Sequence, residues 1–212
     1  MSFFTISRVQ KHSFNIKQSQ FISYIRNCDS VFDFRSWLSQ IKKDHYDASH
    51  VCWAYRIQDD SELHQHSSDA GEPSGTAGAP ILKTMKQHNL IQCGLIAVRY
   101  FGGTKLGRKG LIDVYGNAAL NVINDSTLIK WTNNESYIIS CPIIYYGELI
   151  RSFQKIDGRI IEDKSSDNLR WIVEINSGHL SDLIGLIRST TKGKGEMKSY
   201  KKGADTSKPR RK

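Results

Sequence analysis

The segment from Leu90 to Tyr100 most constrains the fold, because its strongly apolar sequence predicts a buried strand. A cluster of glycines follows this strand, and apolar residues then recur at helical spacing between Leu111 and Val122. The spacing predicts an amphipathic helix that begins near Gly110. A strand followed at once by such a helix is typical of folds that pack helices on a sheet.

The other segments up to residue 129 predict more strands and helices and one long loop. Ser30 has the side chain of a helix N-cap, and the apolar residues after it recur at helical spacing. Alternating apolar and polar residues predict a strand from His50 to Ile57. The remaining expected elements are strands at Phe3–Val9 and Phe21–Arg26 in a hairpin-like opening, a polar connection at Gln10–Gln20, helices at Val31–Asp44 and Pro80–His88, and a loop at Gln58–Ala79.

The second half of the chain has the predicted order strand, helix, strand, strand, helix, strand, which is the order of ferredoxin-like folds. The expected strands are Tyr137–Ile143, Arg159–Lys164, Leu169–Ile175 and Glu196–Tyr200, and the expected helices are Gly147–Ile156 and Leu180–Thr190. We therefore predict a fold of the α+β class with two domains, at residues 1–129 and 135–200, followed by a basic tail at residues 201–212.

Positive charge is concentrated at the end of the chain. Of the 30 Lys and Arg residues, nine lie from Lys192 onward, against two acidic residues in the same segment. A basic tail is typical of proteins that bind a polyanion such as RNA or the ribosome, although a tail that only aids solubility has the same composition. The tail residues assigned to nucleic-acid binding are Lys201, Lys202, Lys208, Arg210, Arg211 and Lys212.

Several classes of protein are excluded. The apolar runs fall far short of the roughly 20 residues that a membrane-spanning helix needs, so no membrane association is expected. The N-terminal segment lacks the pattern of a secretory signal, which predicts a cytoplasmic protein. The four cysteines are widely spaced, without a C-x-x-C motif, and are expected to be reduced and mostly buried. We predict no cofactor and no metal site, because the pattern His64-x-His66-x-x-Asp69 arises by chance in polar loops.

The first of two candidate binding segments, residues 68–78, is rich in glycine. It combines glycines that permit close approach of a ligand with carboxylates, hydroxyls and free backbone N–H groups. It has neither the Lys-Ser/Thr of a phosphate-binding P-loop nor the G-x-S-x-G spacing of a serine hydrolase. The candidate residues here are Asp69, Gly71, Glu72, Pro73, Ser74, Gly75 and Thr76.

The second candidate segment, residues 99–107, leaves the buried strand, turns through paired glycines and enters a helix. Backbone donors at a helix start beside cations form an anion site, for which the phosphate of a nucleotide or of RNA is the natural ligand. The alternative is that the glycines permit tight packing and that Arg99 pairs with Asp69 or Glu72. The candidate residues here are Arg99, Tyr100, Phe101, Gly102, Gly103, Lys105 and Gly107, with Arg108 and Lys109 as further cations and the two aromatic rings able either to stack a base or to close the core.

His50 is a further candidate, because it shares a strand face with Cys52. One interpretation is a Cys–His couple for nucleophilic catalysis, and the other is a partly buried His beside an inert Cys. The strand rise places the two Cβ atoms roughly 6–7 Å apart, which favours the second interpretation.

Three long motifs occur in a specific order: Ala48-Ser-His-Val-Cys-Trp-Ala-Tyr, a loop ending Gly-Glu-Pro-Ser-Gly-Thr-Ala-Gly78, and Arg99-Tyr-Phe-Gly-Gly-Thr-Lys-Leu-Gly followed by Gly110-Leu and Tyr115. Together they resemble the IMPACT family, in its bacterial YigZ-like branch, over nearly the whole chain. The resemblance implies an N-terminal domain like the second domain of a small-subunit ribosomal protein and a ferredoxin-like C-terminal domain similar to one of elongation factor G. It thereby implies contact with RNA or the ribosome. Eukaryotic relatives regulate translation initiation, with an extra N-terminal RWD domain that this sequence does not carry.

The sequence departs from the family motif at three positions. Ala70 stands where a second acid is usual, Ala79 where a basic residue is usual, and Lys109 where a glycine is usual. The lost carboxylate weakens a paired-acid mechanism, and Lys109 adds charge to the anion site. These changes favour binding over catalysis.

The residues and the resemblance together predict a cytosolic, non-enzymatic regulator of translation that binds RNA, the ribosome or a translation-associated protein partner. The alternative is an enzyme acting on a small phosphorylated or carboxylated substrate, with Asp69 or Glu72 as general base and with Arg99 and Lys105 as an anion clamp. A third possibility is a protein-binding module that docks through the ferredoxin-like sheet.

Overall fold

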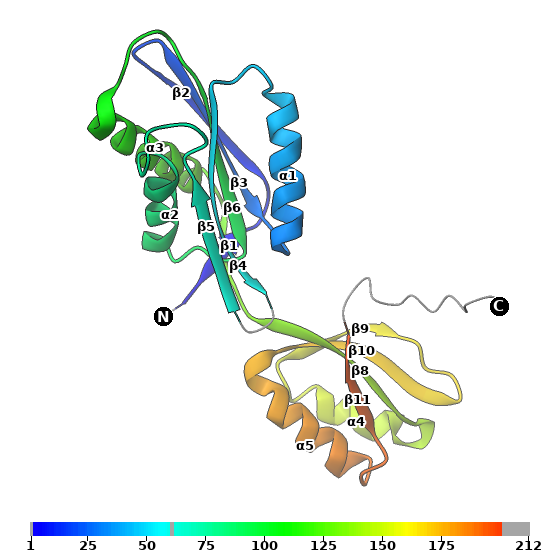
Figure 1. Ribbon diagram of the computed structural model, residues 1–212. Coiled ribbons are helices and arrows are strands. Elements are labelled where there is room, and N and C mark those ends of the chain that lie inside the picture. The colour runs from blue at the N-terminus through cyan, green and yellow to red at the C-terminus, as the bar shows by residue number, and fades with distance from the viewer. Residues whose placement is uncertain (1, 60–61, 201–212) are drawn as a thin grey trace, which may run out of the picture. The chain divides into compact units, whose positions relative to one another are not determined.

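The computed structural model describes residues 2–59 and 62–200 of the chain. The chain divides into two compact units, the first ending at Trp131 and the second beginning at Thr132 (Figure 1). Both units combine antiparallel sheets with helices, which confirms the predicted α+β class with two domains. The tail residues assigned to nucleic-acid binding, Lys201 to Lys212, lie outside the described residues.

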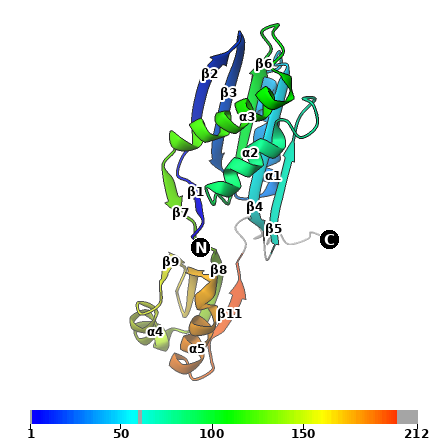
Figure 2. The same ribbon diagram turned by 90° about the vertical axis from the view of Figure 1, so that its left-hand side faces the viewer.

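The first unit is a sheet with helices on both faces. Its strands are β1 (Phe4–Ile6), β2 (Gln10–Ile16), β3 (Ser19–Asn27), β4 (His50–Asp59), β5 (Glu62–Ser68), β6 (Cys93–Tyr100) and β7 (Leu128–Lys130), and its helices are α1 (Val31–Asp44), α2 (Gly78–Gln87) and α3 (Gly107–Asn124). The main sheet is antiparallel, with the strand order β2-β3-β6-β4-β5. Helix α1 covers one of its faces, and α2 and α3 cover the other (Figure 2).

Strand β6 is the centre of this sheet and is buried on both faces, as its apolar sequence predicts. Leu95 and Ala97 pack in the core beneath α2 and α3, whereas Ile96 and Val98 pack in the core beneath α1. The strand then runs through the glycine turn into α3. Strand β6 therefore places Arg99, its penultimate residue, at the edge of the core.

The second unit is a four-stranded antiparallel sheet with two helices packed on it. Its elements are β8 (Asn134–Pro142), the 3-10 turn η1 (Ile143–Tyr145), α4 (Tyr146–Phe153), β9 (Gly158–Asp163), β10 (Asn168–Asn176), the 3-10 turn η2 (Ser177–His179), α5 (Leu180–Thr190) and β11 (Glu196–Ser199). The strand order β11-β8-β10-β9 is the ferredoxin-like arrangement that was predicted. Leu149 and Trp171 lie fully buried in its core.

The predicted helices are confirmed, and two have the predicted bounds. Helix α1 starts after Ser30, whose Oγ accepts a hydrogen bond from the backbone N–H of Asp33 at 3.1 Å, as expected of an N-cap. Helix α5 spans the predicted residues 180–190. Among the described residues, no helix is both long enough and apolar enough to cross a membrane.

The opening of the chain differs from the prediction. The segment Gln10–Gln20, expected as a polar connection, contains β2, which forms a hairpin with β3 through a two-residue turn. Lys17 and Gln18 in this turn have φ values of 45° and 64°, as in the tight turns that follow the twist of a sheet. Alternate residues of β2 are exposed, so its sequence is too polar to be identified as a strand. Strand β1 pairs with β7 and not with β3.

The predicted loop from Gln58 to Ala79 is wrong in its first part. Strand β5 lies there and pairs with β4, from Ser68 opposite Trp53 to Glu62 opposite Asp59. Backbone hydrogen bonds at the edge of the sheet hold this strand, and its largely polar side chains give no strand pattern. The loop itself is confined to residues 69–77.

Candidate functional site

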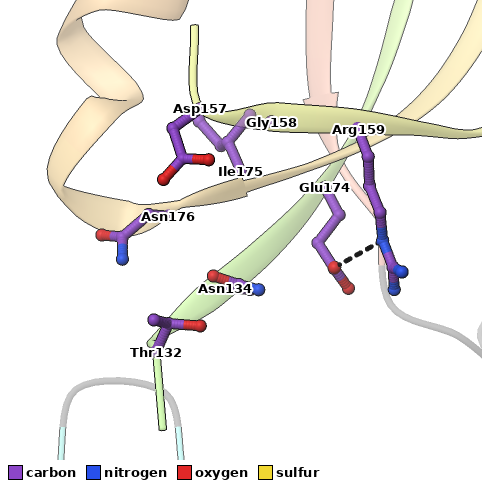
Figure 3. Close-up of a pocket in the computed structure, with 8 residues that line it drawn as sticks. All are labelled: Thr132, Asn134, Asp157, Gly158, Arg159, Glu174, Ile175 and Asn176. Carbon is purple, nitrogen blue, oxygen red and sulfur yellow. Dashed lines mark ion pairs between the residues drawn. The ribbon is translucent and has the colours of Figure 1, made fainter. Parts of the chain in front are cut away.

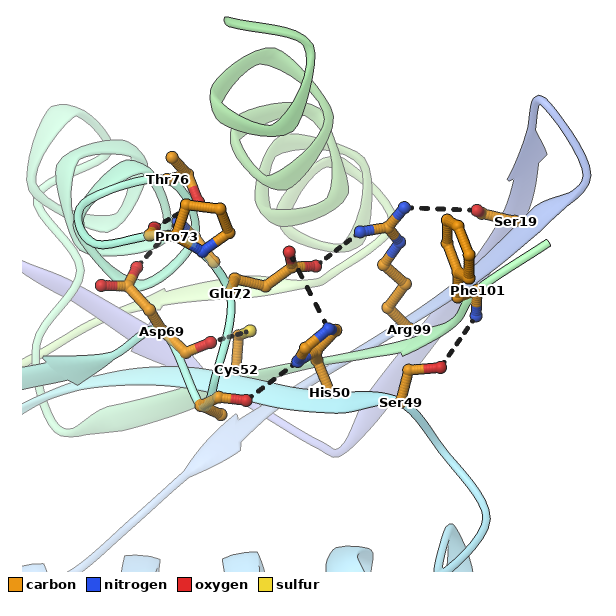
Figure 4. A network of polar contacts seen from close by, with 12 residues as sticks. Ser19, Ser49, His50, Cys52, Asp69, Glu72, Pro73, Thr76, Arg99 and Phe101 are labelled. Atoms are coloured by element: carbon orange, nitrogen blue, oxygen red, sulfur yellow. Dashed lines mark hydrogen bonds and ion pairs between the residues drawn. The ribbon is translucent and has the colours of Figure 1, made fainter. Parts of the chain in front are cut away.

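A cavity of about 460 Å³, here called the cleft, opens in the first unit where the start of β4, the loop after β5 and the connection from β6 to α3 meet. Strand pairing places His50 of β4 directly opposite Arg99 of β6. Figure 4 shows the network of polar side chains beside the cleft. The lining residues are His50, Glu72, Pro73, Arg99, Phe101, Lys105, Leu106, Gly107, Arg108 and Leu111.

A buried ion pair forms the centre of this network. Arg99 Nη1 donates a hydrogen bond to Glu72 Oε1 at 2.8 Å, and the hydroxyl of Tyr115 donates to the same oxygen, also at 2.8 Å. Burial, with Cys52 and Glu72 as further causes, raises the pKa of Tyr115, so its hydroxyl keeps the proton that it donates. The structural pairing of Arg99 with Glu72, which the sequence left as an alternative, is therefore present.

The guanidinium of Arg99 also packs between two aromatic rings. Its central carbon lies 5.5 Å from the ring centroid of Phe21 and 5.2 Å from that of Phe101. Its Nη2 reaches Ser19 Oγ at 3.4 Å, while its buried Nε has no hydrogen-bond partner among the described residues. Phe21 is fully buried, but Phe101 is 46% exposed. Arg99 thus supports an aromatic ring that remains open to a ligand.

Among the described residues, His50 and Cys52 share no hydrogen bond, because each has another partner. His50 Nδ1 lies 3.0 Å from the carbonyl oxygen of Ala70, and its Nε2 lies 3.9 Å from Glu72 Oε2. The thiol of Cys52 donates instead to the carbonyl oxygen of Asp69 at 2.9 Å. Burial raises the pKa of Cys52 to about 12, so the nucleophilic thiolate is scarce at neutral pH. The interpretation of an inert cysteine is the one that fits the geometry.

Asp69 organises the loop between β5 and α2. Its carboxylate accepts three backbone hydrogen bonds, from Gly75 at 2.8 Å and from Ala77 and Gly78 at 2.9 Å each. Burial acts to raise the pKa of Asp69, but these three donors and the charge of Arg108 outweigh it and lower the pKa below 3.8. The carboxylate of Asp69 therefore holds the backbone of its own loop and the start of α2 in place.

The rim of the cleft is basic. Lys105 and Arg108 are exposed, and Arg108 Nη2 donates to the carbonyl oxygen of Ser74 at 2.9 Å. Helix α3 begins between them without a side-chain cap and with no acidic residue in its first turn. Its first backbone N–H groups and the two cations favour an anion at this place.

The cleft brings together only part of the predicted site. Tyr100 turns to the opposite face of the sheet, where its hydroxyl lies 2.7 Å from His45 Nδ1. Gly102 serves packing, because a Cβ there would lie 2.1 Å from the backbone of Gln18. Of the predicted residues, His50, Glu72, Pro73, Arg99, Phe101, Lys105 and Gly107 line the cleft, and Asp69, Gly71, Ser74, Gly75, Thr76, Tyr100, Gly102 and Gly103 do not.

Two lining residues, Leu106 and Leu111, were not predicted, and a third, Arg108, was expected only as a further cation beside the turn. Arg108 carries a signal in the sequence, as a cation next to the glycine turn. The two leucines carry none beyond their apolar character, because position 111 has the helical spacing of a core residue. Leu106 and Leu111 line the cleft only because the chain turns into α3 beside it.

Two other cavities contain little of the predicted site. One, of about 450 Å³, lies in the second unit, where Arg159 Nε pairs with Glu174 Oε1 at 3.0 Å (Figure 3). The other, of about 470 Å³, is a groove between α2 and α3 that reaches Gly75. Neither joins an exposed phenyl ring to a pair of cations, as the cleft does.

Comparison with known proteins places the chain in a family. The model of the Impact N-terminal domain matches residues 17–123. IMPACT family member YvyE of Bacillus subtilis is 28% identical over 93% of this chain and 90% of its own length, and IMPACT family member YigZ of Escherichia coli is 31% identical over 69% and 72%. A crystal structure of a hypothetical protein shares the fold, with a TM-score of 0.67 and 23% identity over 94% of this chain and 98% of that one. The chain therefore belongs to the IMPACT family.

Proposed function

We propose that this protein binds RNA through the cleft of its first unit and acts in this way as a non-enzymatic regulator of translation. The observation that carries the proposal is the exposed ring of Phe101, which lies at the same cavity as Lys105 and Arg108. An aromatic ring beside cations is the combination with which proteins hold unpaired bases and their phosphates.

The charges of the cleft support an anionic ligand. Glu72 is neutralised by Arg99, so Lys105 and Arg108 remain as a net positive charge, next to the uncapped start of α3. Phosphate oxygens are the natural ligand of such a start. The walls beside these cations are apolar, as the base of a nucleotide requires.

The same contacts count against the alternative of an enzyme with Asp69 or Glu72 as general base. The carboxylate of Asp69 is held by three backbone N–H groups, and Glu72 Oε1 is held by Arg99 and Tyr115. Arg99 is 4% exposed and already paired, which makes it unsuited to clamp a substrate anion. These side chains serve the shape of the cleft.

The link to translation rests on membership of the IMPACT family and on the role in translation that the resemblance implies. We extend the proposal to the ribosome as the place where the RNA is met, to the cytoplasm as the compartment, and to the basic tail of residues 201–212 as a source of additional salt-sensitive affinity. A domain division at residues 1–129 and 135–200 then separates the RNA-binding part from the ferredoxin-like part.

RNA binding by the full chain across a salt series tests the proposal. The K105A/R108A variant is expected to bind unstructured RNA more weakly, with the slope of log affinity against log salt smaller by about 1.4, since each lost phosphate contact contributes about 0.7. K42A/K43A is the matched control, because it removes the same charge from exposed positions in the last turn of α1.

A version ending at Lys202 separates the contribution of the remaining tail. If K105A/R108A binds like the unchanged protein while the shortened version loses all affinity, the cleft is not the RNA site. If the full chain binds neither RNA nor ribosomes at low salt, the proposed function is wrong.

A further inference from the structure

We infer that an unpaired RNA strand leaves the cleft across the first turn of α3 and continues along the groove between α2 and α3. The inference rests on the proposed function, because it takes the cleft as one end of the path. It deepens that function by naming the form of the RNA, a single strand of several nucleotides. It also assigns a ligand to the groove, a cavity of about 470 Å³.

The groove begins beside the cleft. The loop between β5 and α2 borders both cavities, since Pro73 lines the cleft and Gly75 lines the groove. Helix α3 also borders both, since Leu111 lines the cleft and Ile112 lines the groove. Arg108, in the first turn of α3, lines the cleft and donates a hydrogen bond to a carbonyl oxygen of the same loop. A cation of the basic rim therefore lies where a strand would pass from one cavity to the other.

The two helices that form the groove are basic. They lie on the same face of the sheet (Figure 2), and within their bounds they carry four Lys and Arg residues against one acid, Asp113. Helix α1, on the other face, carries three cations against two acids. The face with the groove is therefore the one that attracts a phosphate backbone. Its four cations are exposed and form no ion pair among the described residues: Lys83, Lys86, Arg108 and Lys109.

The lining of the groove suits the other parts of a nucleotide. The side-chain amides of Gln87 and Asn117 are exposed on its two walls, and an amide can both donate to and accept from base edges and ribose hydroxyls. A Cβ on Gly116 would meet nothing within 4 Å, so the groove is open at this point of α3. Among the described residues of α2 and α3, Ile112 is the one large apolar side chain that is exposed. A protein partner needs several apolar or aromatic anchors, so this composition favours RNA.

The extent of the path indicates the length of the strand. About 20 Å of helix, at 1.5 Å per residue, separates Gly107, which lines the cleft, from Leu120, which lines the groove. Proteins that track a single strand along a basic groove have site sizes that begin at about four nucleotides. A dinucleotide therefore occupies the cleft alone, whereas a strand of eight nucleotides also fills the groove.

Binding of RNA oligonucleotides of two, four, eight and twelve nucleotides to the full chain at low salt tests the inference. The affinity is expected to rise at least about 10-fold between two and eight nucleotides, as further phosphates and bases gain contacts, and to change little between eight and twelve. The tail of residues 201–212 is the same in every variant, so comparison of variants isolates the groove.

The first variant removes charge from the groove. K83A/K86A is expected to bind eight nucleotides about 10-fold more weakly, with the salt slope smaller by about 0.7 for each lost phosphate contact. Its affinity for two nucleotides is expected to stay within about 2-fold of the unchanged protein. K42A/K43A on α1 is the matched control and is expected to leave both affinities unchanged.

The second variant fills the groove without a change of charge. G116L places a side chain in the open part of the groove and is expected to weaken the binding of eight nucleotides about 10-fold, but not that of two. G185L is the matched control. It adds the same side chain to a glycine of α5 in the second unit, where a Cβ also meets nothing within 4 Å, and is expected to change neither affinity.

The outcomes separate the inference from the proposed function. If K105A/R108A weakens RNA binding while eight nucleotides bind no more tightly than two, or while the groove variants bind like their controls, the inference is wrong and the proposed function stands. If the groove variants weaken RNA binding and K105A/R108A does not, the strand lies on the helices without entering the cleft, and both are wrong. If no RNA binds at low salt, both are wrong as well.

Discussion

Arg99 Nη1 lies 2.8 Å from Glu72 Oε1, and both side chains are at most 5% exposed. Each residue comes from one of the two glycine-rich segments, so the ion pair fastens the loop after β5 to the end of β6. It also fixes the position of Phe101, whose ring packs on the Arg99 guanidinium. A contact that holds the fold together therefore also sets the geometry of the cleft.

Removal of one partner of this pair is expected to destabilise the protein strongly. E72A leaves the Arg99 charge buried without its partner, and the expected loss of unfolding free energy is about 3–5 kcal/mol, measured by urea denaturation. The double variant E72L/R99L is expected to lose less than the sum of the two single changes, because no charge remains buried alone. A loss below about 0.5 kcal/mol for E72A would contradict the pairing. Arg99 is accordingly a poor position at which to test RNA binding.

The lowered pKa of Asp69 implies that this residue stabilises the folded protein in a way that depends on pH. The folded chain holds the pKa of Asp69 below 3.8, so the unfolded chain takes up the proton first as the pH falls. The stabilisation is fully present above 3.8 and is lost as the pH falls through the lowered value. D69N is therefore expected to cost about 1–2 kcal/mol at pH 7, as the loss of a helix cap does, and less at pH 3. Urea midpoints of both proteins at pH 7, 5, 4 and 3 measure the difference; a constant gap would contradict the assignment.

The sequence predicts those helices and strands in which apolar residues recur at a regular spacing. Helix α1 begins at the N-cap that Ser30 supplies, and β6 is buried on both faces as its composition requires. The sequence does not predict β2 or β5, because both strands lie at the edges of the sheet. The hydrogen bonds that hold an edge strand come from backbone groups, which all residues share, and a half-exposed strand tolerates polar side chains.

The sequence predicts those features of the cleft that depend on one short segment, but not those that depend on contacts between segments. The basic rim follows from the cations that flank the turn into α3. The partners of Asp69 and Glu72 do not, because two carboxylates three residues apart look equivalent in sequence. One faces the backbone of its own loop and the other faces Arg99, 27 positions further along the chain. Tertiary contact alone assigns them different roles.

Substitution by alanine is expected to change the stability in opposite directions at two glycines of the first unit. A Cβ on Gly102 would lie 2.1 Å from the backbone of Gln18, so G102A must displace the β2–β3 turn and is expected to cost about 2–3 kcal/mol. A Cβ on Gly116 of α3 meets nothing within 4 Å, and G116A is expected to stabilise the protein by about 0.5–1 kcal/mol. Thermal unfolding of the two variants checks the signs, and a stabilising G102A would show that the turn does not lie against this glycine.

The four cysteines are expected to resist modification in the folded protein and to react together on unfolding. All four are free and buried. Burial raises the pKa of Cys28 to about 11 and that of Cys52 to about 12, and it also raises the pKa of Cys93 and Cys141. The thiolate is the reactive form, so both its scarcity and its inaccessibility slow the reaction. With an aromatic disulfide reagent at pH 8, we expect almost no release of the coloured thiol from the native chain and four equivalents in urea. A fast first equivalent from the native chain would mean that one thiol is both exposed and activated. If that thiol were Cys52, its hydrogen bond to the carbonyl oxygen of Asp69 would not describe the thiol in solution, and a Cys–His couple with His50 would have to be considered again.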